Sequence, residues 1–405
     1  MASFSRRVLA VVAGLFLFAA FTNFAHAQKV QLGIDVLKTM DYAQLRGKRV
    51  GLITNQTGVD SAGERTRVLL AHAPGVKLVA LFTPEHGLDG NEPAGKYVAS
   101  RRDHVTGLPA YSLYGPTRKP TPQMLAGIDV LVYDMQDIGS RSYTYISTML
   151  KCMEAAGENH IAFMVLDRPN PLGGLRVEGP PIDPQRMSFV GPLPVPYIHG
   201  MTAGELAKMA NASRWTGKQC NLTVIPMQGW QRNMLWTDTG LRWVATSPNI
   251  PNSTSPFYYV VTGIVGELAG LDVGCGGSQP FEVIAAKWLN PKAFTVYMRS
   301  YKTPGVSFAA YSNGPLQGSR ISIDTRSIAD TNLCAIGIYI LAGIDHGENI
   351  FEVSRGDKLD MFYKCYGSDS IRTQIEHAVP VRQIVAGWAP GVARFEEARK
   401  PYLLY

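Results

Sequence analysis

Short apolar runs alternate with stretches of helical spacing along the first 225 residues of the chain. The apolar runs lie at 49–54, 77–82, 129–133, 161–166 and 222–225. Apolar residues at helical spacing lie between them, at 64–72, 143–158 and 202–209. Continuously apolar strands that alternate with helices are typical of a parallel sheet covered on both faces. The pattern therefore predicts an α/β fold with a doubly wound, mostly parallel sheet.

The last third of the chain has a different composition, and the change falls near Asn290 and Pro291. It contains a strand pattern at 320–323 and a helix pattern at 333–341. We expect a first domain over 28–290 and a smaller C-terminal domain of mixed helices and strands over 291–405.

The N-terminus has the pattern of a secretory signal peptide. Arg6 and Arg7 precede an apolar run from Val8 to Phe21, and Ala25-His26-Ala27 follows as a cleavage site. The run is too short for an ordinary membrane span, although an uncleaved anchor is the alternative. We expect cleavage near Ala27 and export to the periplasm or the medium, with no stable membrane insertion.

The composition of the 405 residues is that of a globular protein, with 46% hydrophobic and 18% charged residues. The net charge of +7 is spread over isolated basic pairs, so binding to nucleic acid is not expected. Five cysteines occur without a C-x-x-C spacing, at Cys152, Cys220, Cys275, Cys334 and Cys365. An exported protein can form two disulfides from them, or keep them as buried thiols.

Several motifs of cofactor chemistry are missing from the sequence. The first strand is not followed by G-x-G-x-x-G, and the chain has no phosphate-binding loop, no H-E-x-x-H and no G-x-S-x-G. Residues 271–277 resemble the glycine loop of a methyltransferase, but they come after two thirds of the chain. We therefore expect no cofactor and no metal.

Polar clusters follow four of the predicted strands. They contain Asn55, then Glu85 and His86, then Asp137, and finally Asp167, Arg168 and Asn170. Ligands of open α/β sheets bind at the carboxyl ends of the strands. We expect these four strand ends to meet in one site.

Glu85 is the strongest candidate for a proton donor, because it lies between Pro84 and Gly87 in a shaped loop. A glutamate in such a loop can be desolvated and act as a general acid. His86 is a candidate second proton carrier, and Glu178 is another acid in a shaped loop. The alternative is that Glu85 caps a helix and His86 is a packed loop residue.

The sequence resembles a family long described as DUF1343. The resemblance depends on F-T-P-E-H-G at 82–87, D-I-G through Y-T-Y at 137–145, L-D-R-P-N-P-L-G-G at 166–174, V-E-G-P at 177–180, H-G-M-T at 199–202, S-P-N-I-P at 247–251 and the terminal Y-L-L-Y. Members of this family are exo-acting β-N-acetylmuramidases of glycoside hydrolase family 171.

This resemblance implies a Rossmann-like N-terminal domain that releases N-acetylmuramic acid from the non-reducing ends of peptidoglycan fragments. It implies that Glu85 is the catalytic glutamate. These motifs, the strand-end cluster at Asn55 and the segment that begins at Glu267 supply the expected substrate-binding residues, which are Asn55, Asp137, Arg141, Tyr145, Asp167, Arg168, Asn170, His199, Asn249 and Glu267. The partner of Glu85 is open: Glu178, Asp137 or Glu267 can act as base or nucleophile, or the 2-acetamido group of the substrate can attack.

One segment departs from the family pattern, which commonly reads E-G-T-N-x-S-x-G-R-G-T. Here Ala269, Gly270 and Cys275 replace its threonine, asparagine and arginine. An arginine fork binds carboxylates well, and N-acetylmuramic acid carries a lactyl carboxylate. The departure motivates a second hypothesis, a non-catalytic protein that binds cell-wall glycans.

Overall fold

The computed structural model describes residues 29–344 and 349–405. The predicted signal peptide, residues 1–27, lies outside these described residues. In the described part of the chain, no helix is both long and apolar enough to cross a membrane.

The N-terminal part is built on a seven-stranded sheet with the order β3-β4-β2-β1-β5-β6-β7. Its strands are β1 (Arg49–Thr54), β2 (Lys77–Thr83), β3 (Arg101–Arg102), β4 (Pro109–Ser112), β5 (Val130–Asp134), β6 (Ala162–Leu166) and β7 (Asn221–Ile225). All neighbours pair in parallel except β3 and β4. This confirms the predicted α/β fold with a mostly parallel sheet.

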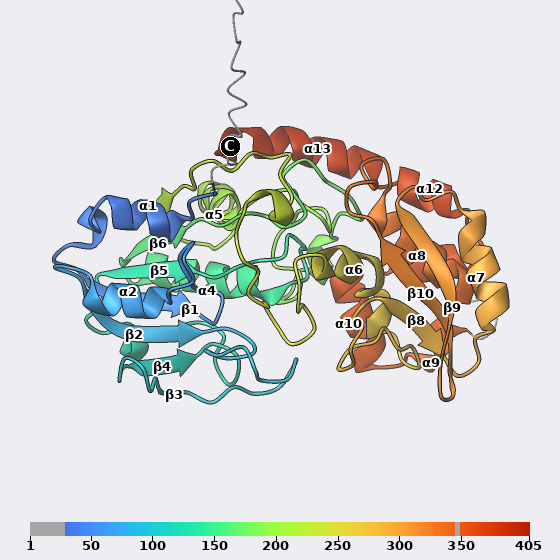
Figure 1. Ribbon diagram of the computed structural model, residues 1–405, viewed down its shortest axis with the longest axis horizontal. Coiled ribbons are helices and arrows are strands. Elements are labelled where there is room, and N and C mark those ends of the chain that lie inside the picture. Colours follow the sequence, from blue (N-terminus) through green and yellow to red (C-terminus); the bar gives the residue numbers. More distant parts are fainter. Residues whose placement is uncertain (1–28, 345–348) are drawn as a thin grey trace, which may run out of the picture.

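Helices cover both faces of this sheet (Figure 1). Those that carry its two cores are α1 (Gly33–Thr39), α2 (Thr66–His72), α4 (Thr144–Glu158) and α5 (Ala203–Ala212). Alternate strand residues face the two cores, so that Leu52 packs with α1 and α2 while Ile53 packs on the side of α4 and α5. Helix α5 starts with the predicted capping box, in which Thr202 and Glu205 bond each other's backbone N–H.

The C-terminal part has a three-stranded antiparallel sheet, in the order β8-β10-β9. Its strands are β8 (Val283–Ala286), β9 (Val306–Asn313) and β10 (Leu316–Ile323). Helix α6 (Ser255–Thr262) packs against α8 (Leu333–Ile344), and α7 (Pro291–Ser300) packs against β9 and β10. Both α6 and β8 precede residue 290, so the C-terminal unit starts earlier than predicted. The apolar pattern of α6 and β8 in the sequence does not indicate which of the two sheets they belong with.

The remaining helices are short or lie at the surface. They are α3 (Pro122–Leu125), α9 (Ile350–Val353), α10 (Asp357–Tyr366), α11 (Ser370–Glu376), α12 (Val381–Ala386) and α13 (Ala389–Arg399). Helix α13 runs from the C-terminal part back across the N-terminal part (Figure 1). The chain then ends against the first sheet, where the Tyr405 hydroxyl donates to Asp167 Oδ2 at 2.8 Å. The last helix therefore connects the two parts.

Candidate active site

Glu85 lies in the loop that follows β2, and its side chain is fixed from two directions. Its Oε1 accepts a hydrogen bond from the Gly95 N–H at 2.7 Å, and its Oε2 accepts one from Thr144 Oγ1 at 2.7 Å. Gly95 belongs to the same loop and has φ = 71°, which favours glycine. Thr144 is the first residue of α4. The residue is 9% exposed, so this carboxyl group is held in one orientation close to the surface.

An aromatic and cationic pair lies beside Glu85. Burial, the charge of the adjacent Glu85 carboxylate and its hydrogen bond to the Tyr114 hydroxyl together raise the pKa of Tyr114 to about 12. The Arg118 guanidinium lies 4.3 Å from the centre of the Tyr114 ring and 4.2 Å from that of Phe189. Arg118 is exposed and forms no ion pair with any described residue. A forked cation is therefore held next to Glu85 by stacking and by a hydrogen bond to the Tyr114 hydroxyl.

Glu267 is a carboxylate of the C-terminal part whose pKa is affected by the charge of Glu85. It ends a short 3-10 helix (Val265–Glu267) and is partly buried, and no described residue donates a hydrogen bond or forms an ion pair to it. Burial raises the pKa of Glu267, the positive charge of Lys358 opposes this increase, and the negative charge of Glu85 adds to it. Glu85 and Glu267 thus share one electrostatic environment, at the boundary between the two parts of the chain. We call Glu85, Glu267, Thr144, Tyr114 and Arg118 the Glu85 site.

Three tyrosines form an aromatic wall next to this site. The Tyr143 and Tyr145 ring centres are 4.8 Å apart, and those of Tyr143 and Tyr259 are 6.0 Å apart. The Tyr143 hydroxyl donates to Thr246 Oγ1 at 2.8 Å, and the Tyr145 hydroxyl donates to the Thr246 carbonyl. Burial raises the pKa of Tyr145, and the charge of Glu85 contributes to the increase. Tyr145 is therefore close to Glu85, and its hydroxyl is already used by Thr246.

The acids that follow β5 and β6 are buried in the protein interior. Asp137 Oδ2 accepts from the Gly139 N–H at 2.7 Å, and burial raises the pKa of Asp137 to about 7. Asp167 accepts from Thr202 Oγ1 and the Gly204 N–H at the start of α5, and burial raises its pKa to about 6. Both oxygens of Asp167 are used by donors of the protein, whereas Asp137 Oδ1 is buried and has no partner among the described residues.

Most of the other predicted binding residues also bond the protein itself. Arg141 is buried and donates to four backbone carbonyls, including those of Cys365 and Tyr366 in the C-terminal part. Arg168 pairs with Asp134, with 2.6 Å between Nε and Oδ1. Three other residues also bond the protein itself. Asn55 Oδ1 accepts from Thr57, Asn170 Nδ2 donates to the Met201 carbonyl, and His199 Nδ1 accepts from the Met201 N–H. Burial lowers the pKa of His199 to about 3, which keeps it neutral.

The two other residues that were predicted to be catalytic lie in different surroundings. The His86 Nδ1 lies 2.7 Å from the Glu92 carbonyl oxygen, and its ring lines a separate cavity of about 200 Å³. Glu178 forms an ion pair with Arg176 and accepts from the Leu333 N–H at 2.7 Å, at the start of α8. Glu178 therefore joins the two parts of the chain, and its two oxygens already have partners.

The divergent segment 267–277 leads from Glu267 into the C-terminal sheet. Asp272 pairs with Ala285 of β8, and Gly276 N–H donates to Asn249 Oδ1 at 2.9 Å. Strand β8, and not a helix, directly follows this segment, so it lacks the strand-to-helix geometry of a methyltransferase loop. Cys275, which lies at the position of the family arginine, is exposed. All five cysteines are free, and the other four are buried.

Sequence reasoning missed three contributors to the Glu85 site: Thr144, Tyr114 and Arg118. Thr144 lies inside the Y-T-Y motif, so its position next to a motif tyrosine was a usable signal. In the sequence, Arg118 is part of an isolated basic pair with Lys119, and nothing there links it to Glu85. In the part of the chain that the structure describes, no group of three or more His, Cys, Asp or Glu residues lies together as a metal site would require.

Two family models match consecutive parts of the chain. The model of the N-terminal domain of the exo-β-N-acetylmuramidase NamZ matches residues 50–254, and that of the C-terminal domain matches 257–405. The break between the two models agrees with the early start of the C-terminal unit.

Individual relatives are similar over almost their whole length. The chain is 39% identical to the peptidoglycan β-N-acetylmuramidase NamZ of Bacillus subtilis (strain 168), over 99% of this chain and 100% of the relative. Two crystal structures of DUF1343 family proteins from Bacteroides fragilis NCTC 9343 are also similar, each over 93% of this chain and 99% of theirs. Their TM-scores are 0.86 and 0.70, at 42% and 29% identity. The chain therefore belongs to the exo-β-N-acetylmuramidase NamZ family, and it is a glycosidase.

Proposed function

We propose that this protein is an exported glycosidase that releases N-acetylmuramic acid from the non-reducing ends of peptidoglycan fragments. The observation that carries the proposal is the Glu85 site, where an oriented carboxyl group lies near a second, unpartnered carboxylate in a chain of this family. The name of the relative from Bacillus subtilis supports peptidoglycan as the substrate. The pattern from Arg6 to Ala27 supports export.

Glu85 is the proposed general acid. Most glycosidases use two carboxyl groups on either side of the scissile bond, and one of them protonates the leaving oxygen. Gly95 and Thr144 each occupy one oxygen of Glu85, so the direction of its acidic group is set before substrate binds. An oriented proton donor lowers the barrier, because it needs no rearrangement in the transition state.

Glu267 is the proposed second carboxylate. Of the three acids considered from the sequence, Asp137 is buried and bonded by its own loop, and Glu178 is used by Arg176 and α8. Glu267 has no such partners among the described residues, and it interacts with the charge of Glu85. An acid in this position can activate water or attack the anomeric carbon.

Arg118 is the proposed contact to the lactyl carboxylate of the substrate. N-acetylmuramic acid differs from N-acetylglucosamine by this acidic ether group, so a free cation next to the catalytic acid gives a basis for selectivity. The guanidinium is stacked between Tyr114 and Phe189, and the N–H groups that do not bond the Tyr114 hydroxyl are available for contact with a carboxylate. It would replace the family arginine that is Cys275 in this chain.

The proposal is tested by product analysis with the full-length mature protein. A chromogenic β-N-acetylmuramide and the matching N-acetylglucosaminide are assayed side by side, and peptidoglycan fragments are digested and their products identified. We expect turnover of the muramide, much slower turnover of the glucosaminide and free N-acetylmuramic acid from the fragments. Binding of the fragments without any turnover would instead support the non-catalytic hypothesis.

A further inference from the structure

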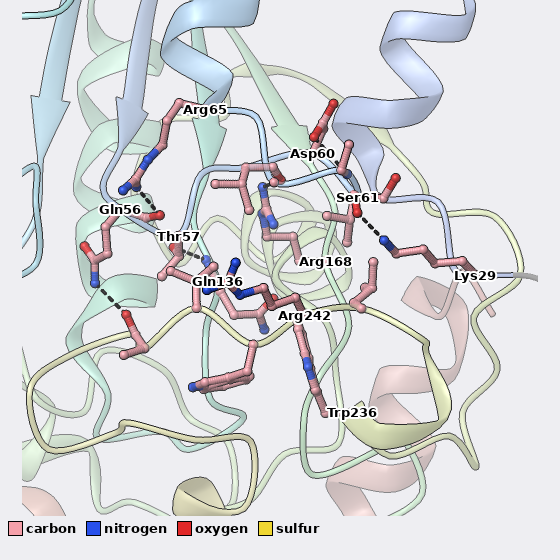
Figure 2. A pocket seen from close by; sticks show the side chains of 18 residues that line it. Lys29, Gln56, Thr57, Asp60, Ser61, Arg65, Gln136, Arg168, Trp236 and Arg242 are labelled. Atoms are coloured by element: carbon pink, nitrogen blue, oxygen red, sulfur yellow. Dashed lines mark hydrogen bonds between the residues drawn. The ribbon is translucent and has the colours of Figure 1, made fainter.

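A cavity of about 460 Å³ lies at the same edge of the first sheet as the Glu85 site (Figure 2). Its lining includes Gln56 and Thr57 after β1, Gln136 after β5 and Arg168 after β6. Strand β1 pairs with β2 on one side and with β5 on the other, so the strand order changes direction at β1. The cavity is therefore at the topological switch point, where open α/β sheets bind ligands.

A wall of protein separates this cavity from the Glu85 site. The Gln56 Nε2 donates to the carbonyls of Ala245 and Thr246, at 2.8 and 2.9 Å. The hydroxyl groups of Tyr143 and Tyr145, which lie near Glu85, bond the same Thr246. The segment 245–246 is held between the two regions, so the cavity is a second location and not part of the Glu85 site.

The lining of the cavity carries an excess of positive charge. Its cations are Lys29, Arg65, Arg168 and Arg242, of which Arg168 is already paired with the buried Asp134. Asp60 is the one carboxylate among the described lining residues, and it already accepts from the N–H groups of Ala62 and Glu64. Arg242 is exposed and has no hydrogen bond or ion pair with a described residue, and Figure 2 shows it among the lining side chains. This surplus of cations favours an anionic ligand.

The cavity also has an aromatic surface. Trp236 and Trp243 pack edge to face with 4.8 Å between ring centres, and both line the cavity. Tryptophan suits the apolar face of a sugar ring.

We propose that this cavity binds an acidic sugar, a hydroxylated ring that carries one carboxylate or phosphate group. The cations that face the cavity bind the acidic group, and a tryptophan contacts the ring. The volume is sufficient for a monosaccharide or a disaccharide. This site would hold a unit of an acidic glycan away from the reacting bond. Its occupancy is independent of the proposed reaction.

Three probes that share one ring test this assignment by titration calorimetry: glucuronate, glucose 6-phosphate and glucose. The protein is the full mature chain, and tryptophan fluorescence provides a second readout. We expect at least one of the two acids to bind at least about tenfold more tightly than glucose, and the stronger acid then identifies the preferred anionic group. Equal binding of glucose, or no binding of either acid at millimolar concentration, overturns the assignment.

Variants locate the bound probe. We expect Arg242→Ala to weaken binding of the acidic sugar about tenfold, because it removes one free cation from the lining. Arg382→Ala is the matched control, since Arg382 is also exposed and without a described partner, but lies on α12. Arg118→Ala should leave the affinity for the probe unchanged. Loss of binding in Arg118→Ala with full binding in Arg242→Ala would place the probe in the Glu85 site and contradict the inference.

Discussion

The loop after β2 and the loops after β5 and β6 present acids at the same edge of one sheet, but with different surroundings. Asp137 and Asp167 are buried; donors of the protein occupy both oxygens of Asp167 and the Oδ2 of Asp137, whose Oδ1 has no partner among the described residues. Glu85 is bonded to Gly95 and Thr144, but it also lies near Glu267, which has no such donors. The position of an acid at a strand end therefore does not decide its role.

The two regions differ in which other segments of the chain lie near their acids. The N-terminus of α5 and the C-terminal Tyr405 fill the space around Asp167. Near Glu85 the C-terminal part instead contributes Glu267, whose pKa the charge of Glu85 raises. If this difference decides the role of each acid, substitutions around Glu85 should reduce activity, and substitutions of the buried acids should change stability.

The largest effect is expected for Glu85→Gln. The variant keeps the shape and the hydrogen-bond acceptor but cannot donate an acidic proton, so kcat on peptidoglycan fragments should fall by about a thousandfold or more. Thermal unfolding serves as the control and should change little. Wild-type kcat in a folded Glu85→Gln variant would remove this residue from the mechanism.

The next effect is expected for Glu267→Gln, with a decrease in kcat of about a hundredfold or more. Because burial raises the pKa of Glu267, its ionised form is populated only at higher pH than that of an exposed glutamate. The acid side of the wild-type pH–rate profile should therefore lie above the ordinary glutamate range, and this limb should be lost in the variant. Glu178→Gln provides the comparison, and a larger loss of kcat there than in Glu267→Gln would reverse our assignment.

A smaller and more selective effect is expected for Arg118→Ala. Loss of the guanidinium should raise KM for the chromogenic muramide about tenfold to a hundredfold, because a charged hydrogen-bonded contact is worth about 1.5–3 kcal/mol. The weak activity on the neutral glucosaminide should change less than threefold, and Arg118→Lys should recover part of the loss. Equal losses on the two substrates would argue against recognition of the lactyl group.

The smallest effect on activity is expected for Asp137→Asn, which should change the pH dependence of stability. The pKa of Asp137 is about 7 in the folded protein, against 3.8 as its ordinary value. As pH rises between these values, the unfolded chain loses its proton first, so the free energy of unfolding of the wild type falls by a few kcal/mol. The variant lacks this decrease. Chemical denaturation at pH 4 and pH 8 measures it, and parallel pH profiles would show that Asp137 is not buried as described.

Much of the first sheet could be predicted from the sequence, because its strands are apolar on both faces. The strands at 49–54, 77–83 and 130–134 are found within a residue of their predicted bounds. The C-terminal sheet was harder. Strand β8 is a short apolar segment that pairs with β10 more than thirty residues later, and no local pattern encodes that pairing.

The candidate site was predictable only in part. The loop chemistry around Glu85 is local, so the sequence could identify it. The nearness of Glu267 and Arg118 depends on how distant segments pack, and their sequence positions carry no sign of it. Residues such as Arg141 and Asn170 belong to recognisable motifs, but their side chains bond backbone groups of the protein interior. Motif membership therefore did not separate residues that shape the site from residues that would touch a ligand.

The central claim is that Glu85 delivers the proton to the leaving oxygen, and the dependence on the leaving group tests it most directly. Wild type and Glu85→Gln are compared on two β-N-acetylmuramides, one with a sugar as leaving group and one with dinitrophenol, which departs without protonation. We predict a loss of about a thousandfold on the first substrate and less than about tenfold on the second. Equal losses on both substrates would contradict the assignment of Glu85 as the general acid.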